Sequence, residues 1–364
     1  MEKENKNKYK EIYLNYNKLK KNSIKIRIYY FDLLRIFSAF SVILIHVSAE
    51  YYNHINIDNP NWKISFYYNG FSRFGVPIFF MISGTLFLGK NISLYIIIYK
   101  YILRLVICLI IWSFIYSIYN IEFSKNNIEK ILLKFFSGHF HFWYIFATIE
   151  LYILSPFLRE IVKSNLLNDL IKISFIFTFL ITNLNILKYY LPRILSEISA
   201  LLYSRLNFDK FKGNIFYFIL GYYLNNKKRI ENKLQFLIYF LGILGFLFTT
   251  IILYHISNRN KQKLLIFFGS SNLNILLYSA SIFVLFKEHF NNLSSNKKLI
   301  IKKISNYTFG IYLIHPLIIE TTIKNFYFSY FRLFIPLKAL IVFILSFLIS
   351  VLLKKIPILG KYII

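Results

Sequence analysis

The sequence predicts an all-α membrane protein that crosses the bilayer about ten times, with both termini in the cytoplasm. Of its 364 residues, 57% are hydrophobic and only 16% are charged, whereas a soluble chain carries roughly a quarter charged residues. The mean hydropathy is positive, at +0.51. Apolar stretches recur along the whole chain, each near the ~20 residues that a helix needs to cross the hydrocarbon core. Most of the surface is therefore expected to face lipid.

Ten apolar stretches are candidates for membrane spans. We expect the spans at residues 30–49, 71–89, 99–119, 140–158, 170–187, 211–224, 234–255, 273–286, 304–322 and 334–353. The longest loop between them covers residues 188–210, which is too short for a soluble domain. We therefore expect a single transmembrane domain over residues 30–364. The basic segment before it, residues 1–29, is expected to be cytoplasmic and not to be a cleavable signal.

The basic residues are unevenly distributed along the chain. The formal net charge of +28 would suggest nucleic-acid binding in a soluble protein. With the N-terminus inside, however, the cytoplasmic segments carry about twice as many Lys and Arg residues as the outer segments, which fits the positive-inside rule. The charge therefore orients the chain on anionic lipid, and no nucleic-acid partner is expected.

The first span contains three ionisable residues, Asp32, Arg35 and His46. A charge inside the bilayer costs at least ~2.5 kcal/mol on insertion scales, which makes each residue a candidate for function. Helical geometry places Arg35 and His46 within ~20° of one face and about 16 Å apart along the axis. The alternative is a local Asp32–Arg35 ion pair near the headgroups and a histidine that only makes a structural hydrogen bond.

The second span combines a cation, a proline and small residues. Arg73 is expected to enter the membrane on the same outer side as His46. Pro77 is expected to kink the helix because it lacks a backbone donor. Ser83 and Gly84 offer a small packing surface deeper in the membrane. Arg73 is either a snorkelling side chain or a cation beside His46 that holds an anionic or carbonyl group.

The fourth span brings several polar side chains to the outer side. His141, Trp143 and Tyr144 are expected at the outer interface, where an aromatic belt accounts for the Trp and the Tyr without any function. Glu150 is expected in the interior, where a carboxylate needs a partner or a wet cavity.

The ninth span carries His315, followed by Pro316, in its outer half. With this topology six of the seven histidines lie at or toward the outer side. Three of them, His54, His139 and His255, are expected to be loop residues without a role. The histidines fall on different helices at irregular spacing, so no metal site is expected.

Several catalytic motifs are absent from the sequence. It contains no His-Glu-x-x-His, Cys pair, Walker glycine loop or Gly-x-Ser-x-Gly, which argues against a zinc protease, an ATPase and a serine hydrolase. The single cysteine, Cys108, cannot form a disulfide within the chain and is expected to fill space in the third span.

Four segments, in order along the chain, resemble the acyltransferase 3 family of bacterial integral-membrane O-acyltransferases. Their combination and separation carry the resemblance, which extends over nearly the whole chain. The segments are Asp32-x-x-Arg35 followed after ten residues by His46; Arg73-x-x-x-Pro77-x-Phe79-Phe80-x-x-Ser83-Gly84; His141-x-Trp143-Tyr144 leading to Tyr152 and Pro156; and Ser305-x-x-Thr308-Phe309-Gly310-Ile311-Tyr312-Leu313-Ile314-His315-Pro316.

The resemblance implies transfer of an acyl group, usually acetyl from cytoplasmic acetyl-coenzyme A, to a hydroxyl of a cell-envelope carbohydrate or lipid-linked glycan. The protein would be a multi-pass protein of the bacterial cell membrane that binds its donor as a substrate and holds no permanent cofactor. The family's key histidine corresponds to His46, its paired arginine to Arg35 and its second-helix arginine to Arg73. The chain resembles stand-alone members without a fused extracytoplasmic esterase-like domain. The acceptor, the acyl group and the oligomeric state stay open.

The matched residues suit acyl transfer from a thioester to an alcohol. His46 can act as general base or as acyl carrier, and Arg73 can stabilise the oxyanion. Arg35, with Asp32, lies toward the cytoplasm and suits the phosphate or pantetheine part of the donor. Supporting or acceptor-site roles are expected for His141, Trp143, Tyr144, Glu150, Ser83 and His315.

Two other functions could use the same residues. A transporter or flippase for an envelope lipid or sugar would use the intramembrane Arg and His residues to bind its substrate and relay protons. A membrane acyltransferase of another fold, acting on lipid or protein, would share the buried histidine. The ordered match of four segments disfavours the second alternative, and release of coenzyme A separates an enzyme from a flippase.

Overall fold

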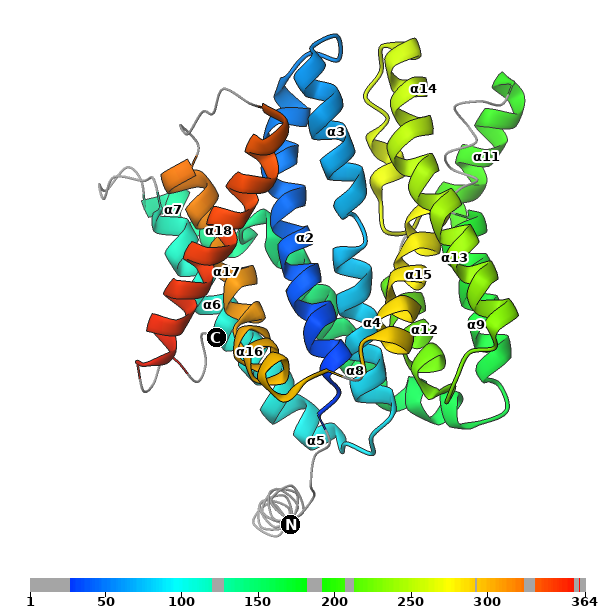
Figure 1. Cartoon of the computed structure of the whole chain (residues 1–364), viewed down its shortest axis with the longest axis vertical. Helices are drawn as coiled ribbons and strands as arrows, with labels where there is room; N and C mark the ends of the chain where they lie inside the picture. The colour runs from blue at the N-terminus through cyan, green and yellow to red at the C-terminus, as the bar shows by residue number, and fades with distance from the viewer. Residues whose placement is uncertain are drawn as a thin grey trace.

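The structure is a computed structural model that describes residues 27–119, 128–181, 192–206, 213–291, 293–323, 331–356 and 360. Within these ranges every regular element is a helix (Figure 1). Several predictions fall at least partly outside the described residues: the basic segment as far as residue 26, the end of the fifth expected span at 182–187, the loop at 188–191 and 207–210, the start of the sixth span at 211–212, and the end of the expected domain at 357–359 and 361–364.

Each of the ten expected spans overlaps at least one helix. The first half of the chain forms α2 (Tyr29–His54), α3 (Pro60–Ser72), α4 (Gly75–Leu88), α5 (Leu94–Ile96), η1 (Ile97–Ile102), α6 (Leu103–Ile118), α7 (Ile128–Ser137), η3 (Phe140–Phe142), α8 (Trp143–Lys163), α9 (Leu167–Phe175) and η4 (Ile176–Ile181). The second half forms α11 (Arg193–Leu206), α12 (Asn214–Asn226), α13 (Asn232–Leu247), η6 (Phe248–Ile252), α14 (Leu253–Asn260), η7 (Leu265–Phe268), α15 (Leu273–His289), α16 (Ser295–Ser305), α17 (Thr308–Ile318), η8 (Ile319–Ile323) and α18 (Phe331–Lys354).

Six helical segments in the described part of the chain are long and apolar enough to cross a membrane. They are Tyr29–His54, Pro60–Leu88, Leu94–Ile118, Asn232–Asn260, Leu265–His289 and Leu333–Lys354, and a shorter apolar helix covers Thr308–Thr321. The chain is therefore an α-helical, multi-pass membrane protein, as its composition predicts.

Three amphipathic helices are among those that occupy stretches predicted to be loops. They are α7, α11 and α16, and each mixes charged with apolar residues, as in the SNKKLIIKKIS sequence of α16. Hydropathy averaged along such a stretch is low even when one side of the helix is apolar. The averaging that finds spans therefore misses amphipathic helices.

The second expected span begins earlier than predicted. Asn59 caps the start of α3 by accepting a hydrogen bond from the backbone N–H of Asn61, and Pro60 occupies the first turn, where its missing donor is tolerated. The helical segment then runs to Leu88 with a break after Ser72. The prediction that the span starts at Phe71 is therefore wrong, because the polar residues of α3 lower its mean hydropathy.

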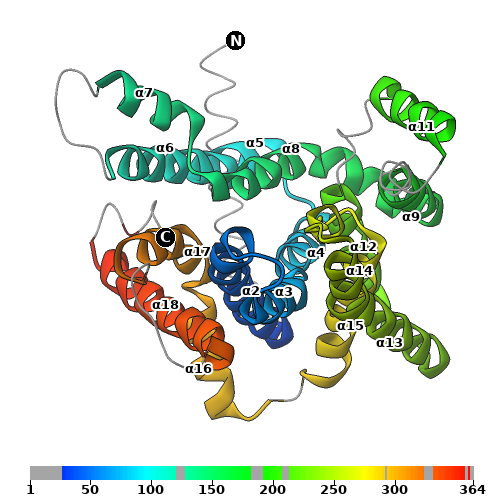
Figure 2. The same cartoon turned by 90° about the horizontal axis from the view of Figure 1, so that it is seen from above.

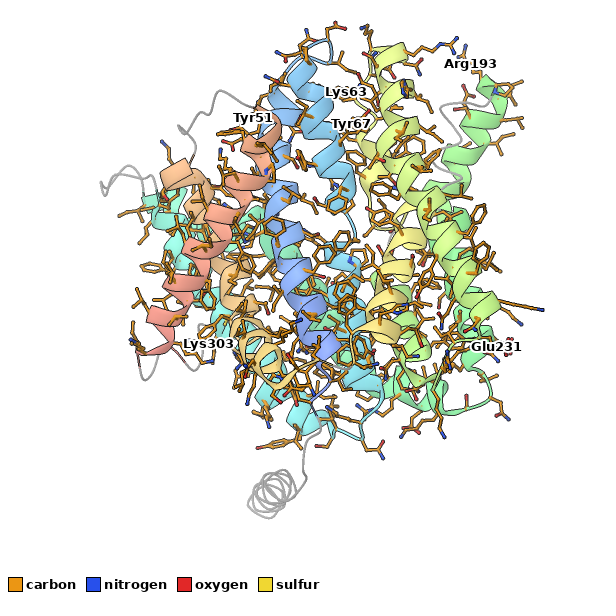
Figure 3. All side chains as sticks on the ribbon, viewed as in Figure 1. Tyr51, Lys63, Tyr67, Arg193, Glu231 and Lys303 are labelled. Carbon is orange, nitrogen blue, oxygen red and sulfur yellow. The ribbon has the colours of Figure 1, made fainter. Side chains whose placement is uncertain are left out.

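The helices surround α2. It contacts α3 and α4 on one side and α17 and α18 on another, and α6 and α8 run along a third side of the bundle (Figure 2). The side chains of Tyr51, Lys63 and Tyr67 lie toward one end of the bundle, and those of Glu231 and Lys303 lie toward the opposite end (Figure 3).

Small residues bring α4 and α12 into close contact. A Cβ atom on Gly84 would lie 1.7 Å from the carbonyl oxygen of Phe218, and one on Gly221 would lie 2.1 Å from that of Met81. Helices in lipid gain little from hydrophobic burial against each other, so close backbone approach is a main source of their association. This contact fixes the position of α4 and, with it, the break that precedes α4.

Candidate functional site

A cavity of about 850 Å³ lies at the N-terminal end of α2. Four cationic side chains line it, and we call it the basic cavity: Arg27, Arg35, Lys90 and Lys302. The carboxylate of Asp32, which also lines the cavity, is only 1% exposed and is paired with Arg27 (Nε–Oδ2, 2.5 Å) and with Arg35 (Nη1–Oδ1, 2.9 Å). The cavity therefore keeps an excess of positive charge, which suits phosphate groups.

Asp32 joins the first and last of the four matched segments. Its Oδ1 accepts a hydrogen bond from the hydroxyl of Ser305 (2.8 Å) in addition to the bond from Arg35. The local ion pair considered as an alternative is therefore present. It leaves Arg35 in place at the cavity, because Arg35 lines both the basic cavity and the next cavity along α2.

A narrower cavity of about 190 Å³ continues from Arg35 toward the middle of the bundle. It shares Arg35 and Leu86 with the basic cavity. We call it the aromatic cavity because six rings line it: Phe79, Phe87, Tyr144, Tyr152, Phe309 and Tyr312. The hydroxyls of Ser83 and Thr308 also belong to its lining. Its size and apolar walls suit a thin, uncharged chain and not a nucleotide.

Beyond the aromatic cavity four histidine rings lie side by side. Tyr312, which lines the aromatic cavity, contacts two of them: its ring centroid lies 5.3 Å from that of His141 and 6.0 Å from that of His315. The ring of His315 in turn lies 5.2 Å from His46, and the ring of His141 lies 4.8 Å from His139. The structure therefore brings together His46, His141 and His315, which the sequence places in three separate segments, and adds His139.

The ring of His46 faces a third cavity, of about 530 Å³. We call it the histidine cavity; its ionisable lining residues besides His46 are Glu50, His54, Arg73 and Glu320. Phe140 closes one side with its ring 5.2 Å from that of His46. Arg35 and His46, which are expected near one face of α2, therefore each line a cavity: Arg35 the basic cavity and His46 the histidine cavity.

The His315-Pro316 pair fixes the orientation of one imidazole. Pro316 lies inside α17 and has no N–H to donate to the carbonyl of Tyr312, four residues earlier. That carbonyl instead accepts a hydrogen bond from Nδ1 of His315 at 2.7 Å. A neutral imidazole that donates from Nδ1 keeps a lone pair on Nε2. Nε2 of His315 is buried and has no hydrogen-bond partner among the described residues.

The break between α3 and α4 positions Arg73 in the middle of a helical segment. The chain breaks at residues 73–74. Pro77, in the first turn of α4, has no N–H to donate to the carbonyl of Arg73, four residues earlier, so the kink expected from this proline is present. Arg73 lines the same cavity as His46, on the side where the sequence places it. A break inside a membrane must satisfy its freed carbonyl groups internally. The Ser41 hydroxyl donates to Ser72 O (2.6 Å) and the Tyr278 hydroxyl donates to Gly70 O (2.9 Å).

Asn69 ties Arg73 to the turn of α2 that carries His46. Its Oδ1 accepts hydrogen bonds from Nε (2.9 Å) and Nη2 of Arg73. Its Nδ2 donates to the carbonyl of Ile45 and to the hydroxyl of Ser48, both at 3.0 Å. The Arg73 guanidinium is therefore held at the wall of the histidine cavity.

Lys338 of α18 supports the same cavity from the other side. Its ammonium group contacts the Glu50 carboxylate at 2.9 Å and the Tyr51 hydroxyl at 3.0 Å. The Lys338 side chain is buried, whereas that of Glu50 is 26% exposed. This ion pair gives Lys338, which lies within the tenth expected span, a partner for its charge, and it holds Glu50 at the histidine cavity.

Two predicted site residues lie away from the cavities. Trp143 is 48% exposed at the start of α8, as an aromatic belt residue would be. Glu150 is exposed on α8, whereas Ala147 and Leu151 of the same helix are buried. The prediction that Glu150 lies in the interior is wrong, because hydropathy alone does not show which side of a span faces its neighbours.

Several site residues were not predicted. His139 joins the histidine cluster, and His54 ends α2 and lines the histidine cavity, although the sequence predicts both as loop residues without a role. His139 is a loop residue, as predicted, whereas His54 and His255 are helical, in α2 and α14. Helical spacing could have found Glu50, four residues after His46, and Asn69, four residues before Arg73. No group of three or more His, Cys, Asp or Glu side chains suited to a metal ion occurs in the part of the chain that the structure describes.

Comparison with known proteins gives one family and one group of relatives. Residues 28–355 match the model of the acyltransferase 3 family, described as an acyltransferase domain. The chain is also similar to proteins named probable poly-beta-1,6-N-acetyl-D-glucosamine export protein. Those of Staphylococcus aureus strains MSSA476 and N315 are 25% identical to it over 311 residues, or 82% of this chain and 83% of theirs. The protein of strain MRSA252 is 24% identical over the same length. No solved structure matches the chain significantly.

Proposed function

Because the chain belongs to the acyltransferase 3 family, we propose that it transfers an acyl group, most simply acetyl, from cytoplasmic acyl-coenzyme A to a hydroxyl of an envelope carbohydrate. The observation that carries the proposal is the series of three cavities along α2, with arginine at one end and histidine at the other. The proposal includes ten crossings of the bacterial cell membrane, with both termini and the basic cavity on the cytoplasmic side, as the distribution of Lys and Arg favours.

The basic cavity is the proposed binding site for the nucleotide part of the donor. Coenzyme A carries three phosphate groups on its nucleotide and a thin, largely uncharged pantetheine arm. Arg35 stands where the basic cavity meets the aromatic cavity, with Asp32 holding its guanidinium. Phosphates bound at the basic cavity would direct the arm into the aromatic cavity, toward Tyr312 and the histidines.

His46 and Arg73 are the proposed catalytic residues. An acceptor hydroxyl in the histidine cavity attacks the acyl carbonyl directly or after the acyl group has moved to His46. In the direct route the new O–C bond forms as the C–S bond breaks, His46 takes the hydroxyl proton, and the electron pair leaves with sulfur. In the carrier route His46 nitrogen first displaces sulfur, and the hydroxyl then displaces His46. Arg73 stabilises the negative charge that develops on the carbonyl oxygen in either route.

The names of the relatives suggest an acceptor to test first. They refer to a poly-β-1,6-linked N-acetylglucosamine polymer, and every sugar of such a polymer offers hydroxyl groups. The side chains of Glu50, Arg73 and Glu320 can bind hydroxyls and amides at the histidine cavity. A β-1,6-linked N-acetylglucosamine oligosaccharide is therefore the acceptor probe used below.

A second candidate function is export of such a polymer without acyl transfer, which the relatives' names favour. The two functions are separated with purified protein in sealed vesicles supplied with acetyl-coenzyme A and the oligosaccharide. The enzyme releases free coenzyme A in step with acetylated oligosaccharide. Movement of the oligosaccharide across the vesicle membrane with the thioester intact would instead support the exporter.

A further inference from the structure

A chain of hydrogen-bonded groups leads from the buried histidines to the surface. Nδ1 of His141 and Nδ1 of His139 are 2.7 Å apart, and Nε2 of His139 lies 3.2 Å from Oε1 of Glu320. His141 is 2% exposed, whereas the side chains of His139 and Glu320 are 16% and 36% exposed. This hydrogen-bonded series therefore begins at a buried imidazole and ends at a carboxylate that lines the histidine cavity.

Glu320, at the end of this series of hydrogen-bonded groups, also lines a second cavity. Glu320 and His139 line a cavity of about 270 Å³ together with Lys134, Tyr119 and Tyr116. Glu320 is therefore accessible from two directions, and a proton that reaches its carboxylate can pass to solvent.

The hydrogen bonds determine where the protons are when both imidazoles are neutral. A carboxylate only accepts, so Nε2 of His139 must donate to Glu320. Nδ1 of His139 is then an acceptor, which makes Nδ1 of His141 the donor. His141 consequently keeps a lone pair on Nε2, and this atom is buried without a hydrogen-bond partner among the described residues.

Neighbouring residues hold the His139 ring in this geometry. The ring stacks on Tyr116, with centroids 4.1 Å apart and planes at 22°. The Tyr116 hydroxyl donates to Leu313 O at 2.9 Å and accepts from Leu317 N at 3.2 Å. It therefore bridges a backbone carbonyl and a backbone N–H of α17 that lie on either side of Pro316. The position of His139 is therefore tied to the helix that carries His315.

His315 connects this chain to the proposed catalytic residue. Its ring lies 5.2 Å from that of His46 and 5.7 Å from that of His141. Its Nε2, like that of His141, is a buried nitrogen with an unused lone pair. A protonated His46 therefore has a neutral base, His315, beside it, and His315 lies beside His141, which is hydrogen-bonded toward the surface.

We propose that His315, His141, His139 and Glu320 release the proton of the acceptor hydroxyl to the outer side of the membrane. The proposal rests on the proposed acyl transfer. His46 receives the proton as the acceptor oxygen bonds to the acyl carbon, and the proton passes by way of His315 to Nε2 of His141. His141 gives its Nδ1 proton to His139, and His139 gives its Nε2 proton to Glu320 and then to water.

The other half of the proton balance lies on the cytoplasmic side. The thiolate of coenzyme A leaves with the electron pair of the C–S bond and takes one proton from the cytoplasm. Each transfer therefore consumes one proton at the donor side and releases one at the acceptor side. Acyl transfer through this route moves one positive charge outward without a separate transport step.

The test uses the full-length protein in sealed vesicles, with acetyl-coenzyme A on the donor side and the β-1,6-linked N-acetylglucosamine oligosaccharide on the acceptor side. We expect Glu320→Gln to lower kcat by ~10- to 100-fold with the KM for acetyl-coenzyme A unchanged. We expect formate to restore kcat in Glu320→Ala in a dose-dependent manner, because a small carboxylate can enter where Glu320 is exposed. Glu160→Gln, at an exposed site on α8, should match the wild type.

A pH indicator on the acceptor side supplies a readout that a purely structural role would not change. One proton should appear there per coenzyme A released by the wild type. Release of the proton on the donor side, an unchanged kcat in both Glu320 variants, or a loss of kcat that formate does not restore would each overturn the relay. Absence of acyl transfer by the wild type would overturn the proposed function itself.

Discussion

The two ends of α2 use ionisable residues in opposite ways. At the Arg35 end the buried carboxylate of Asp32 accepts hydrogen bonds from Arg27, Arg35 and Ser305. At the His46 end Nε2 of both His141 and His315 is buried without a partner among the described residues. Satisfied charges beside a large cavity are typical of a binding site, whereas unsatisfied bases store free energy that a reaction can use. Substitutions at the two ends should therefore have different kinetic effects.

The largest effect is expected at His46. We expect His46→Gln to lower kcat for acetyl transfer by ~10²- to 10⁴-fold, because the general base or acyl carrier is lost. Acetyl-coenzyme A should still bind with its normal affinity, measured by calorimetry in detergent. His255→Gln, on the exposed side of α14, is the matched control and should have no effect. A weakened donor affinity in His46→Gln would contradict the division of roles.

Arg73 should give the next largest effect. Arg73→Gln should lower kcat by ~10²- to 10³-fold because it removes a positive charge from the oxyanion. Arg73→Lys should recover part of this loss, and Arg259→Gln, at an exposed site in α14, should behave as the wild type. Steady-state rates at saturating acetyl-coenzyme A measure the effect. Equal kcat values for the Gln and Lys variants would show that the charge of Arg73 is not what matters.

A binding effect is expected at Arg35. We expect Arg35→Gln to weaken acetyl-coenzyme A binding by ~10-fold or more, because hydrogen bonds between charged groups contribute roughly 1.5–3 kcal/mol. The KM for the oligosaccharide should not change. Arg229→Gln, an exposed arginine in the turn after α12, is the control for the loss of one positive charge. Unchanged donor affinity in Arg35→Gln would refute the assignment of the basic cavity.

Substitution of Pro316 should lower kcat the least of these changes, and it should raise the stability of the protein. Pro316→Ala supplies an N–H that competes with His315 for the Tyr312 carbonyl. We therefore expect kcat to fall several-fold while the Tm rises, since proline in a helix interior costs about 3 kcal/mol. Pro336→Ala, in α18, should raise the Tm without changing kcat. A Pro316→Ala variant with wild-type kcat would show that the orientation of His315 is not important.

The sequence predicts the helical membrane fold and most of the residues at the two ends of α2. Composition and span length are sufficient for the fold class, and helical spacing is sufficient to align Arg35 with His46. Pro77 is sufficient to predict the break near Arg73, but the partners of the freed carbonyl groups, Ser41 and Tyr278, lie on other helices and are not visible in the sequence. The exposure of Glu150 and the inclusion of His139 likewise depend on how separate helices pack.

The central claim is that the acyl group passes along α2 from one side of the membrane to the other. The most direct test supplies radiolabelled acetyl-coenzyme A to one side of sealed vesicles and the oligosaccharide only to the opposite side. We predict labelled oligosaccharide on the acceptor side and free coenzyme A on the donor side, in equal amounts. Transfer that occurs only when both substrates are on the same side would contradict the claim.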